Sequence, residues 1–177
     1  MAEQQEQTAG DVIMTRIGQA VMLHRGGDRE EARGRLLELW AEIGEHGDAL
    51  HRCTLAHYMA DTQDDPETEL AWDLRALSAA SELTEDRVTE HHATLAVRAF
   101  SPSLHLNLAA DYAKLDRPDA ARGHLGQARD ASVHLADDEY GDGIRAAIES
   151  LALRLEEGSG GSGGSGGETL GPPRQGS

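Results

Sequence analysis

The chain has 177 residues, which is the usual size of one domain. Aromatic residues make up only 3% of it, while leucine and alanine are abundant, a composition that favours helices over β-sandwiches. The formal net charge of −16 disfavours binding to nucleic acid or to an anionic membrane and favours cationic partners.

Cys53 is the only cysteine, so neither a disulfide framework nor a thiolate zinc site is expected. No apolar stretch approaches the roughly 18 residues of a membrane-spanning helix. The first ten residues, MAEQQEQTAG, lack the pattern of a signal sequence. We therefore expect a cytoplasmic protein, and we expect the polar residues 1–10 to be disordered because they have nothing to bury.

Turn residues recur along the chain and separate segments whose apolar residues have helical spacing. In the first segment Asp11 is a suitable N-cap, and Ile13, Ile17 and Ala20 follow it three or four residues apart. In the SPS segment Ser101 is a suitable N-cap with Pro102 at the first helical position, so we expect a new helix there. The predicted helices span 11–24, 29–43, 49–60, 67–83, 85–99, 102–115 and 118–135, and a last one begins in ADDEYG.

Two stretches of the sequence resemble each other. GGDREEARGRLLELW and KLDRPDAARGHLGQA both have a turn residue, acidic residues, an alanine and a leucine four positions later. The alanines are Ala32 and Ala121, and another small residue precedes each by twelve positions, at Ala20 and Ala109. These small residues predict places where antiparallel helices approach closely.

With these repeats the sequence resembles a tetratricopeptide repeat (TPR) protein. The run SPSLHLNLAADYAKLDRPDAARGHL, followed by DDEYGDGIRAAIESL, is similar to a group of actinobacterial TPR-like proteins. The resemblance covers roughly residues 11–157. It implies an all-α, TPR-like antiparallel helix-pair solenoid of seven or eight helices. It also implies binding of a short or extended peptide rather than catalysis.

No sequence motif indicates an enzyme, a cofactor or a metal. Outside the Gly/Ser run at residues 158–167, the chain lacks a GxSxG motif, a P-loop and a dinucleotide fingerprint, and TEHHATL lacks the spacing of HExxH. The remaining histidines show no ligand spacing, so we expect them to be surface or partly buried residues. Cys53 is expected to be a small core residue, and Trp40 and Trp72 are expected to be core or hinge packing.

The end of the chain has a different composition. Residues 158–167, GSGGSGGSGG, are typical of an engineered flexible linker. A linker of ten residues spans about 16–19 Å and holds the segment attached to it at an effective concentration on the order of millimolar. We therefore interpret residues 168–177, ETLGPPRQGS, as a fused peptide ligand, with a cloning remnant as the alternative.

The chemistry of this peptide fits an extended ligand. Pro172 and Pro173 favour polyproline II, which costs little entropy to bind. Leu170 can anchor in an apolar pocket, and Arg174 can pair with carboxylates of the acidic domain.

Helical phase suggests where such a peptide would lie. Asn107 and Lys114 share a face beside the predicted core leucines, with Asp111 at its edge. The TPR resemblance implies that Asn107 bonds the peptide backbone, and Asp111 and Glu90 are the candidates to pair with Arg174. The predicted groove residues are Tyr58, Glu90, His92, Asn107, Asp111 and Lys114.

The sequence therefore predicts a monomeric, non-enzymatic adaptor that binds a Pro-containing, Arg-bearing peptide segment of another protein. Two alternatives remain open: a regulatory helical domain that senses a small molecule, and a self-associating structural scaffold. An apolar pocket inside the bundle would favour the first alternative, and a large exposed leucine patch would favour the second.

Overall fold

The computed structural model describes residues 2–85 and 91–160, with side chains described for residues 12–83 and 98–159. This part of the chain forms seven α-helices and contains no strand, which confirms the all-α prediction. The helices are α1 (Ala2–Arg25), α2 (Arg29–Ile43), α3 (Ala49–Asp61), α4 (Pro66–Glu85), α5 (His91–Lys114), α6 (Pro118–Ser132) and α7 (Glu139–Gly160).

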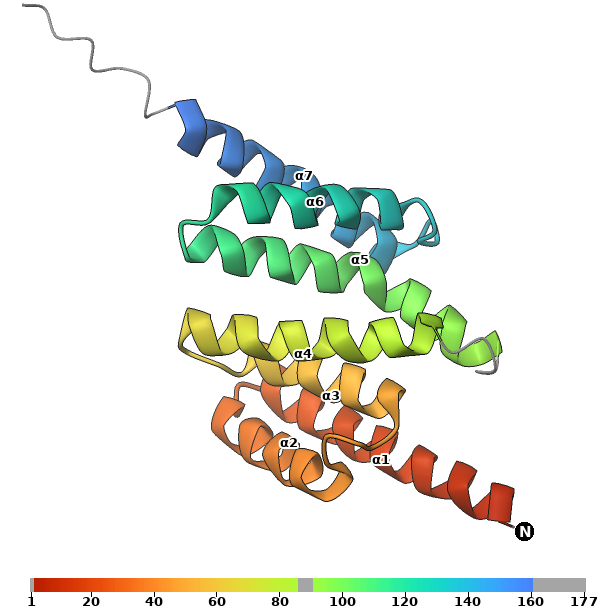
Figure 1. The fold of residues 1–177 in the computed structure, drawn as a ribbon. Helices are drawn as coiled ribbons and strands as arrows, with labels where there is room; N and C mark the ends of the chain where they lie inside the picture. Colours follow the sequence, from red (N-terminus) through yellow and green to blue (C-terminus); the bar gives the residue numbers. More distant parts are fainter. Residues whose placement is uncertain (1, 86–90, 161–177) are drawn as a thin grey trace, which may run out of the picture.

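The helices pair in chain order, and the pairs stack one on another (Figure 1). α1 packs on α2, α3 on α4 and α5 on α6, while α2–α3 and α4–α5 join consecutive pairs. α7 is a last helix that packs on α6 and α5. The helices α1, α3, α5 and α7 also contact one another in order, forming one layer that we call the first-helix face. The architecture is a TPR-like helix-pair solenoid.

Aspartate caps set the start of the second and third helices. The Asp28 side chain accepts a hydrogen bond from the backbone N–H of Glu31 at 3.3 Å. Asp48 accepts from the N–H groups of Leu50 and His51, each at 3.0 Å. These carboxylates satisfy N–H groups that have no partner within the helix, which stabilises each start by about 1 kcal/mol.

Three apolar clusters run through the stack. The first two are formed where neighbouring helix pairs meet, and the third is formed where α7 packs on α5 and α6. Each fully buried leucine or isoleucine stabilises the fold by about 1.5–3 kcal/mol. Representative members are Ile17, Leu36, Leu39, Leu55 and Met59 in the first cluster, Leu70, Leu83, Leu104 and Leu108 in the second, and Leu125, Ile148 and Leu151 in the third. Cys53 belongs to the second cluster, which confirms it as a core residue.

The alanines singled out by the repeat pattern are fully buried within the helix pairs. Ala20, Ala32, Ala109 and Ala121 are all 0% exposed. A larger side chain at these positions would have to displace a neighbouring helix, because protein interiors are close-packed. The prediction of close approach at these four alanines is therefore confirmed.

Two tryptophans join the first two helix pairs. The rings of Trp40 on α2 and Trp72 on α4 meet edge to face, with centroids 5.1 Å apart. The Arg75 guanidinium lies over the Trp72 ring, 4.6 Å from its centroid, which is a cation–π arrangement. Both tryptophans pack against the first and second apolar clusters, so the prediction of a packing role is confirmed.

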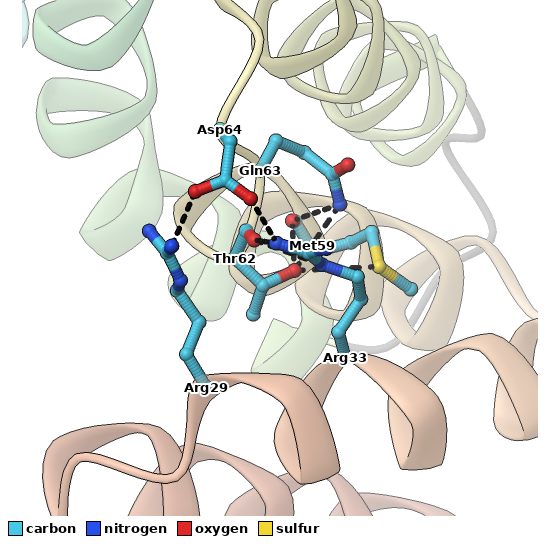
Figure 2. A network of polar contacts seen from close by, with 6 residues as sticks. All are labelled: Arg29, Arg33, Met59, Thr62, Gln63 and Asp64. Carbon is cyan, nitrogen blue, oxygen red and sulfur yellow. Dashed lines mark hydrogen bonds and ion pairs between the residues drawn. The ribbon is translucent and has the colours of Figure 1, made fainter.

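A polar network also links the first two pairs, as Figure 2 shows. Arg33 of α2 donates from Nε to the Thr62 carbonyl oxygen at 2.9 Å, and its Nη2 also bonds this oxygen. The same Nη2 lies 3.0 Å from Asp64 Oδ2, and Arg29 pairs with the other carboxylate oxygen. The two arginines thus hold the end of α3 and the following loop against α2. We call these four residues the arginine clamp.

The N-terminal prediction was wrong over residues 2–10. They belong to α1, which begins at Ala2 rather than behind Asp11. Most of this segment is alanine, glutamate and glutamine, which have high helix propensity. Such residues extend a helix that the packed segment behind them has already nucleated, since adding a turn costs less than starting one.

The predicted helix start at Ser101 and Pro102 was also wrong. α5 runs without interruption from His91 to Lys114 and contains Pro102 in its interior. A proline there loses one backbone hydrogen bond. The Pro102 ring is fully buried, and the Ser103 hydroxyl donates to the Phe100 carbonyl at 2.9 Å. Apolar burial and this added bond offset the lost one.

The last helix ends later than predicted. α7 continues to Gly160, so the first three residues of the predicted linker are helical. The remaining residues of the linker, and the peptide behind it, lie outside the described part of the chain.

Candidate functional site

The first-helix face gathers polar side chains around Tyr58 of α3. Burial raises the pKa of the Tyr58 phenol, the Arg25 charge lowers it, and Tyr140 and Asp61 raise it further. Arg25 is on α1 and Tyr140 is on α7, so groups from three helices lie close enough to influence one phenol. Tyr58 itself is half-buried, which leaves part of its ring accessible on this face.

His57 is buried and joins α3 to α4 and α5. Its ring lies 5.9 Å from the Phe100 ring on α5, measured between centroids. Its Nδ1 lies 3.6 Å from Asp73 Oδ1 on α4, which is too long for a good hydrogen bond. Beneath the exposed residues of α3, the chain therefore has a second, buried layer of polar groups.

Two aspartates form the centre of this buried layer. Asp73 on α4 is 0% exposed and Asp111 on α5 is 1% exposed. Neither Asp73 oxygen has a hydrogen-bond donor within the described residues, and the same holds for Asp111 Oδ2. Two ionised carboxylates are acceptors only, so they cannot satisfy each other.

A proton resolves this conflict. Burial and the neighbouring Asp73 charge raise the pKa of Asp111 to about 8, and burial also raises the pKa of Asp73. Once protonated, Asp111 can donate a hydrogen bond to Asp73 across the contact between α4 and α5. We call Asp73 and Asp111 the carboxyl pair.

The burial of Asp111 corrects its predicted role. The sequence placed Asp111 at the edge of an exposed face, where it would contact Arg174. In the structure it points into the α4–α5 contact, because α4 covers the side of α5 that carries it. Asp111 is thus a packing residue of the solenoid, not an accessible ligand contact.

Lys114 also faces α4. Its ammonium nitrogen lies 2.7 Å from Glu69 Oε2 and 3.9 Å from Asp111 Oδ1. Asn107, one helical turn before Asp111, is half-buried, and its side chain makes no hydrogen bond with a described residue. Of the predicted groove residues, Tyr58 and Asn107 are half-buried and Lys114 is exposed, whereas Asp111 is buried.

The other predicted site residues cannot be placed. Glu90 lies outside the described residues, and only the backbone of His92, within α5, is described. The predicted ligand residues also lie outside the described part of the chain; they are Leu170, Pro172, Pro173 and Arg174.

Sequence reasoning missed an accessible acid close to Tyr58. Asp61 is the last residue of α3 and is exposed, and the surrounding protein raises the pKa of its carboxyl, chiefly by desolvation. Its charge is close enough to raise the pKa of the Tyr58 phenol. The spacing of the two residues, three apart on one helix, was the signal that could have identified it.

Sequence reasoning also treated the histidines as isolated. His105 on α5 and His124 on α6 meet, with their Nδ1 atoms 3.1 Å apart. Their positions differ by nineteen residues, and only the antiparallel packing of the two helices brings them together. Within the described residues, no three histidine, cysteine, aspartate or glutamate side chains are grouped to hold a metal.

Two pockets of the described part bear on the small-molecule alternative. The larger of these two has a volume of about 410 Å³ and lies between α1 and α2. Its lining is almost entirely polar or charged, with Leu39 as its one large apolar residue. A smaller pocket of about 140 Å³ adjoins Trp40. Small-molecule sites are usually lined mainly by apolar side chains, so these cavities do not favour that alternative.

Comparison with known proteins supports a TPR-like chain. Two stretches, residues 13–38 and 102–127, match the tetratricopeptide repeat family, and together they cover less than half of the chain. The first stretch spans parts of α1 and α2, and the second spans parts of α5 and α6, so each coincides with one helix pair. No curated protein matches the chain, and no solved structure matches it.

These matches carry general information about function. TPR repeats generally mediate protein–protein interaction by binding peptides or proteins, and the family is generally not enzymatic. Across residues 2–85 and 91–160, none of the helices combines the length and the apolar character needed to span a bilayer.

Proposed function

We propose that this chain is an adaptor that binds a short, extended, Pro-containing and Arg-bearing peptide on its first-helix face. Residues 168–177 are an example of such a peptide, tethered by the Gly/Ser segment before them. The observation that carries the proposal is the agreement between the two TPR matches and two helix pairs whose first helices, α1 and α5, both belong to this face.

Asn107 is suited to hold the peptide backbone. Its half-buried carboxamide has no partner among the described residues, and an amide can donate to a carbonyl and accept from an N–H group. An extended peptide offers both groups, because polyproline II has no internal hydrogen bonds. The partly accessible ring of Tyr58 provides apolar contact area for Leu170 or for the prolines.

Asp61 is the proposed partner of the peptide arginine. It is exposed beside Tyr58, whereas Asp111 is buried in the α4–α5 contact. A guanidinium can bond a carboxylate through two N–H groups, and desolvated surroundings strengthen such a pair. The net charge of −16 adds a long-range attraction for a cationic segment.

The test uses the full chain and a tail-disabled variant of it, Leu170→Ala with Arg174→Ala. We expect the backbone amide resonances of α3 and α5 near Tyr58 and Asn107 to differ between the two proteins. Synthetic ETLGPPRQGS is then added to the tail-disabled chain and followed by calorimetry. We expect saturable binding that moves the same resonances back toward those of the original chain.

Two controls sharpen this experiment. A peptide carrying both alanine substitutions should not bind, and Asp61→Asn in the tail-disabled chain should weaken binding by about 5- to 100-fold, as expected for a charged hydrogen bond of about 1–3 kcal/mol. Identical spectra for the two chains, together with no binding at millimolar peptide, would mean that the tail is not a ligand of this face.

A further inference from the structure

The imidazole rings of His105 and His124 face each other edge to edge. Their Nδ1 atoms are 3.1 Å apart, their centroids are 5.4 Å apart, and their planes differ by 23°. In an imidazole each nitrogen lies only about an ångström from the ring centre. The two distances are therefore compatible only if both Nδ1 atoms lie close to the line that joins the ring centres. Each nitrogen points at the other.

Both rings favour the neutral form, which is the form that binds metal ions. Burial lowers the pKa of His105, with a smaller effect from His124, and burial lowers the pKa of His124. A neutral imidazole has one N–H and one bare nitrogen, so one ring donates its Nδ1 proton to the Nδ1 of the other. The pair thus offers one nitrogen lone pair directly and a second one after the donor ring moves its proton to Nε2.

The pair is held in place from both helices. The ring of His124 stacks on that of Tyr112, with centroids 5.4 Å apart and planes within 8°. Tyr112 belongs to α5, so it fixes the His124 ring of α6 against the helix that carries His105. Ala109 and Ala121, which are both fully buried, set the close spacing of these two helices. Such preorganisation reduces the entropy cost of bringing two ligands together.

We propose that His105 and His124 bind one divalent transition-metal ion through their Nδ1 atoms, linking α5 to α6. Metal–nitrogen bonds of about 2.0–2.1 Å with a bond angle between square-planar and tetrahedral need a nitrogen separation of roughly 2.8–3.4 Å. The observed separation of 3.1 Å falls within this range, and each ring has to turn by about 40° so that the lone pairs, which now point at each other, converge on the ion.

The chemistry of this site is set by its two ligands. The bridging proton moves from Nδ1 to Nε2 of the same ring, so the neutral pair releases no net proton when the ion binds. No third His, Cys, Asp or Glu among the described residues is grouped with the pair, so water completes the coordination. Imidazole nitrogen suits copper, nickel and zinc, and Cu²⁺ is expected to bind most tightly of the three. The protein's charge of −16 raises the local concentration of such cations.

The test titrates Cu²⁺, Ni²⁺ and Zn²⁺ into the full chain at neutral pH, using calorimetry, and follows the imidazole nitrogens by NMR with the diamagnetic ion Zn²⁺. We expect one saturable site, and we expect metal binding to shift the Nδ1 resonances of His105 and His124. The variants His105→Gln and His124→Gln should each weaken binding at least tenfold, which is the smallest effect expected from losing one of two ligands. The matched control is His134→Gln, because His134 is exposed just beyond α6.

The nine histidines of the chain make this control necessary. Binding that is weakened equally by all three substitutions, or by none of them, overturns the proposal. So does the absence of saturable binding at millimolar metal. A circular-dichroism melt of each metal-free variant identifies a folding defect. If a glutamine variant does not fold, the imidazole resonances of the unmodified chain alone decide, and unchanged His105 and His124 Nδ1 shifts then overturn the proposal.

Discussion

The carboxyl groups of Asp73 and Asp111 meet inside the contact between α4 and α5, where neither is accessible to water. They come from the second and third helix pairs, so one shared proton lies at the junction between two repeat units. Glu69 of α4 faces the same place with a further negative charge, and Lys114 of α5 opposes it. Stability at this junction therefore depends on pH.

The direction of this dependence is set by Asp111. Its pKa in the folded protein is about 8, above the value of 3.8 for an unperturbed aspartate, so the folded state holds a proton that the unfolded state releases. The contribution to stability is complete below about pH 4 and is lost as the pH rises through about 8. We expect the free energy of unfolding, measured with urea, to fall across this interval.

Asp111→Asn should remove most of this pH dependence. Asparagine keeps a donor for Asp73 and carries no charge, so we expect the variant to be more stable than the original chain by about 1–3 kcal/mol at pH 9. At pH 5 the two proteins should be similar. The control is Asp116→Asn, an exposed loop position, and an unchanged pH profile for Asp111→Asn would contradict the shared proton.

Arg33 should matter more than the other arginines of α2. Arg33→Ala removes both bonds to the Thr62 carbonyl and one contact with Asp64, so we expect a loss of about 1–3 kcal/mol in urea unfolding. Arg33→Lys should recover only part of it, because an ammonium lacks the planar fork of a guanidinium. The control is Arg35→Ala, because Arg35 makes only an exposed ion pair with Glu31. This variant should lower the free energy of unfolding by less than about 0.5 kcal/mol. Equal losses at Arg33 and Arg35 would show that the arginine clamp has no special role.

Ala109→Leu should destabilise the third helix pair. Ala109 is 0% exposed between α5 and α6, and a larger side chain forces neighbouring residues apart at a cost of about 1–3 kcal/mol. Ala71→Leu, on the exposed side of α4, should change stability by less than about 0.5 kcal/mol. Thermal denaturation followed by circular dichroism compares the two. A melting temperature as high for Ala109→Leu as for Ala71→Leu would refute close packing at this position.

Cys53 should be unreactive in the folded protein. The residue is 1% exposed, and burial, with Asp73 nearby, raises the pKa of its thiol to about 11. Thiol reagents attack the thiolate, so we expect Ellman's reagent to label the native chain very slowly at neutral pH and completely in urea. Rapid labelling without denaturant would show that the second apolar cluster opens readily.

Much of the fold was readable from local sequence. Helix segments and the four buried alanines depend on residues within one or two turns of each other, so helical periodicity was enough to predict them. Two of the errors at helix boundaries have a common cause. Ala2 to Gly10 and Pro102 were judged by local preference, whereas helix propagation from a packed segment and burial of the proline ring determined the outcome.

The site was less predictable, because it too depends on tertiary packing rather than on local sequence. The sequence predicted Tyr58 and Asn107 as groove residues from helical phase, and their role stays a prediction, but it placed Asp111 on an exposed edge, whereas the structure buries it. Which side of α5 is covered depends on how α4 packs against it, and that packing involves residues 38 positions apart, such as Asp73 and Asp111.

The amino-acid pattern alone was enough to establish a series of acidic, amphipathic helices with alanines where pairs approach. The meeting of distant polar groups depended on tertiary packing: the carboxyl pair between α4 and α5, the arginine clamp between α2 and α3, and the histidines between α5 and α6. Local periodicity fixes the face of a helix on which a side chain lies. The partner on that face is set by the stacking of whole helices, which minimises exposed apolar surface and brings distant residues into contact.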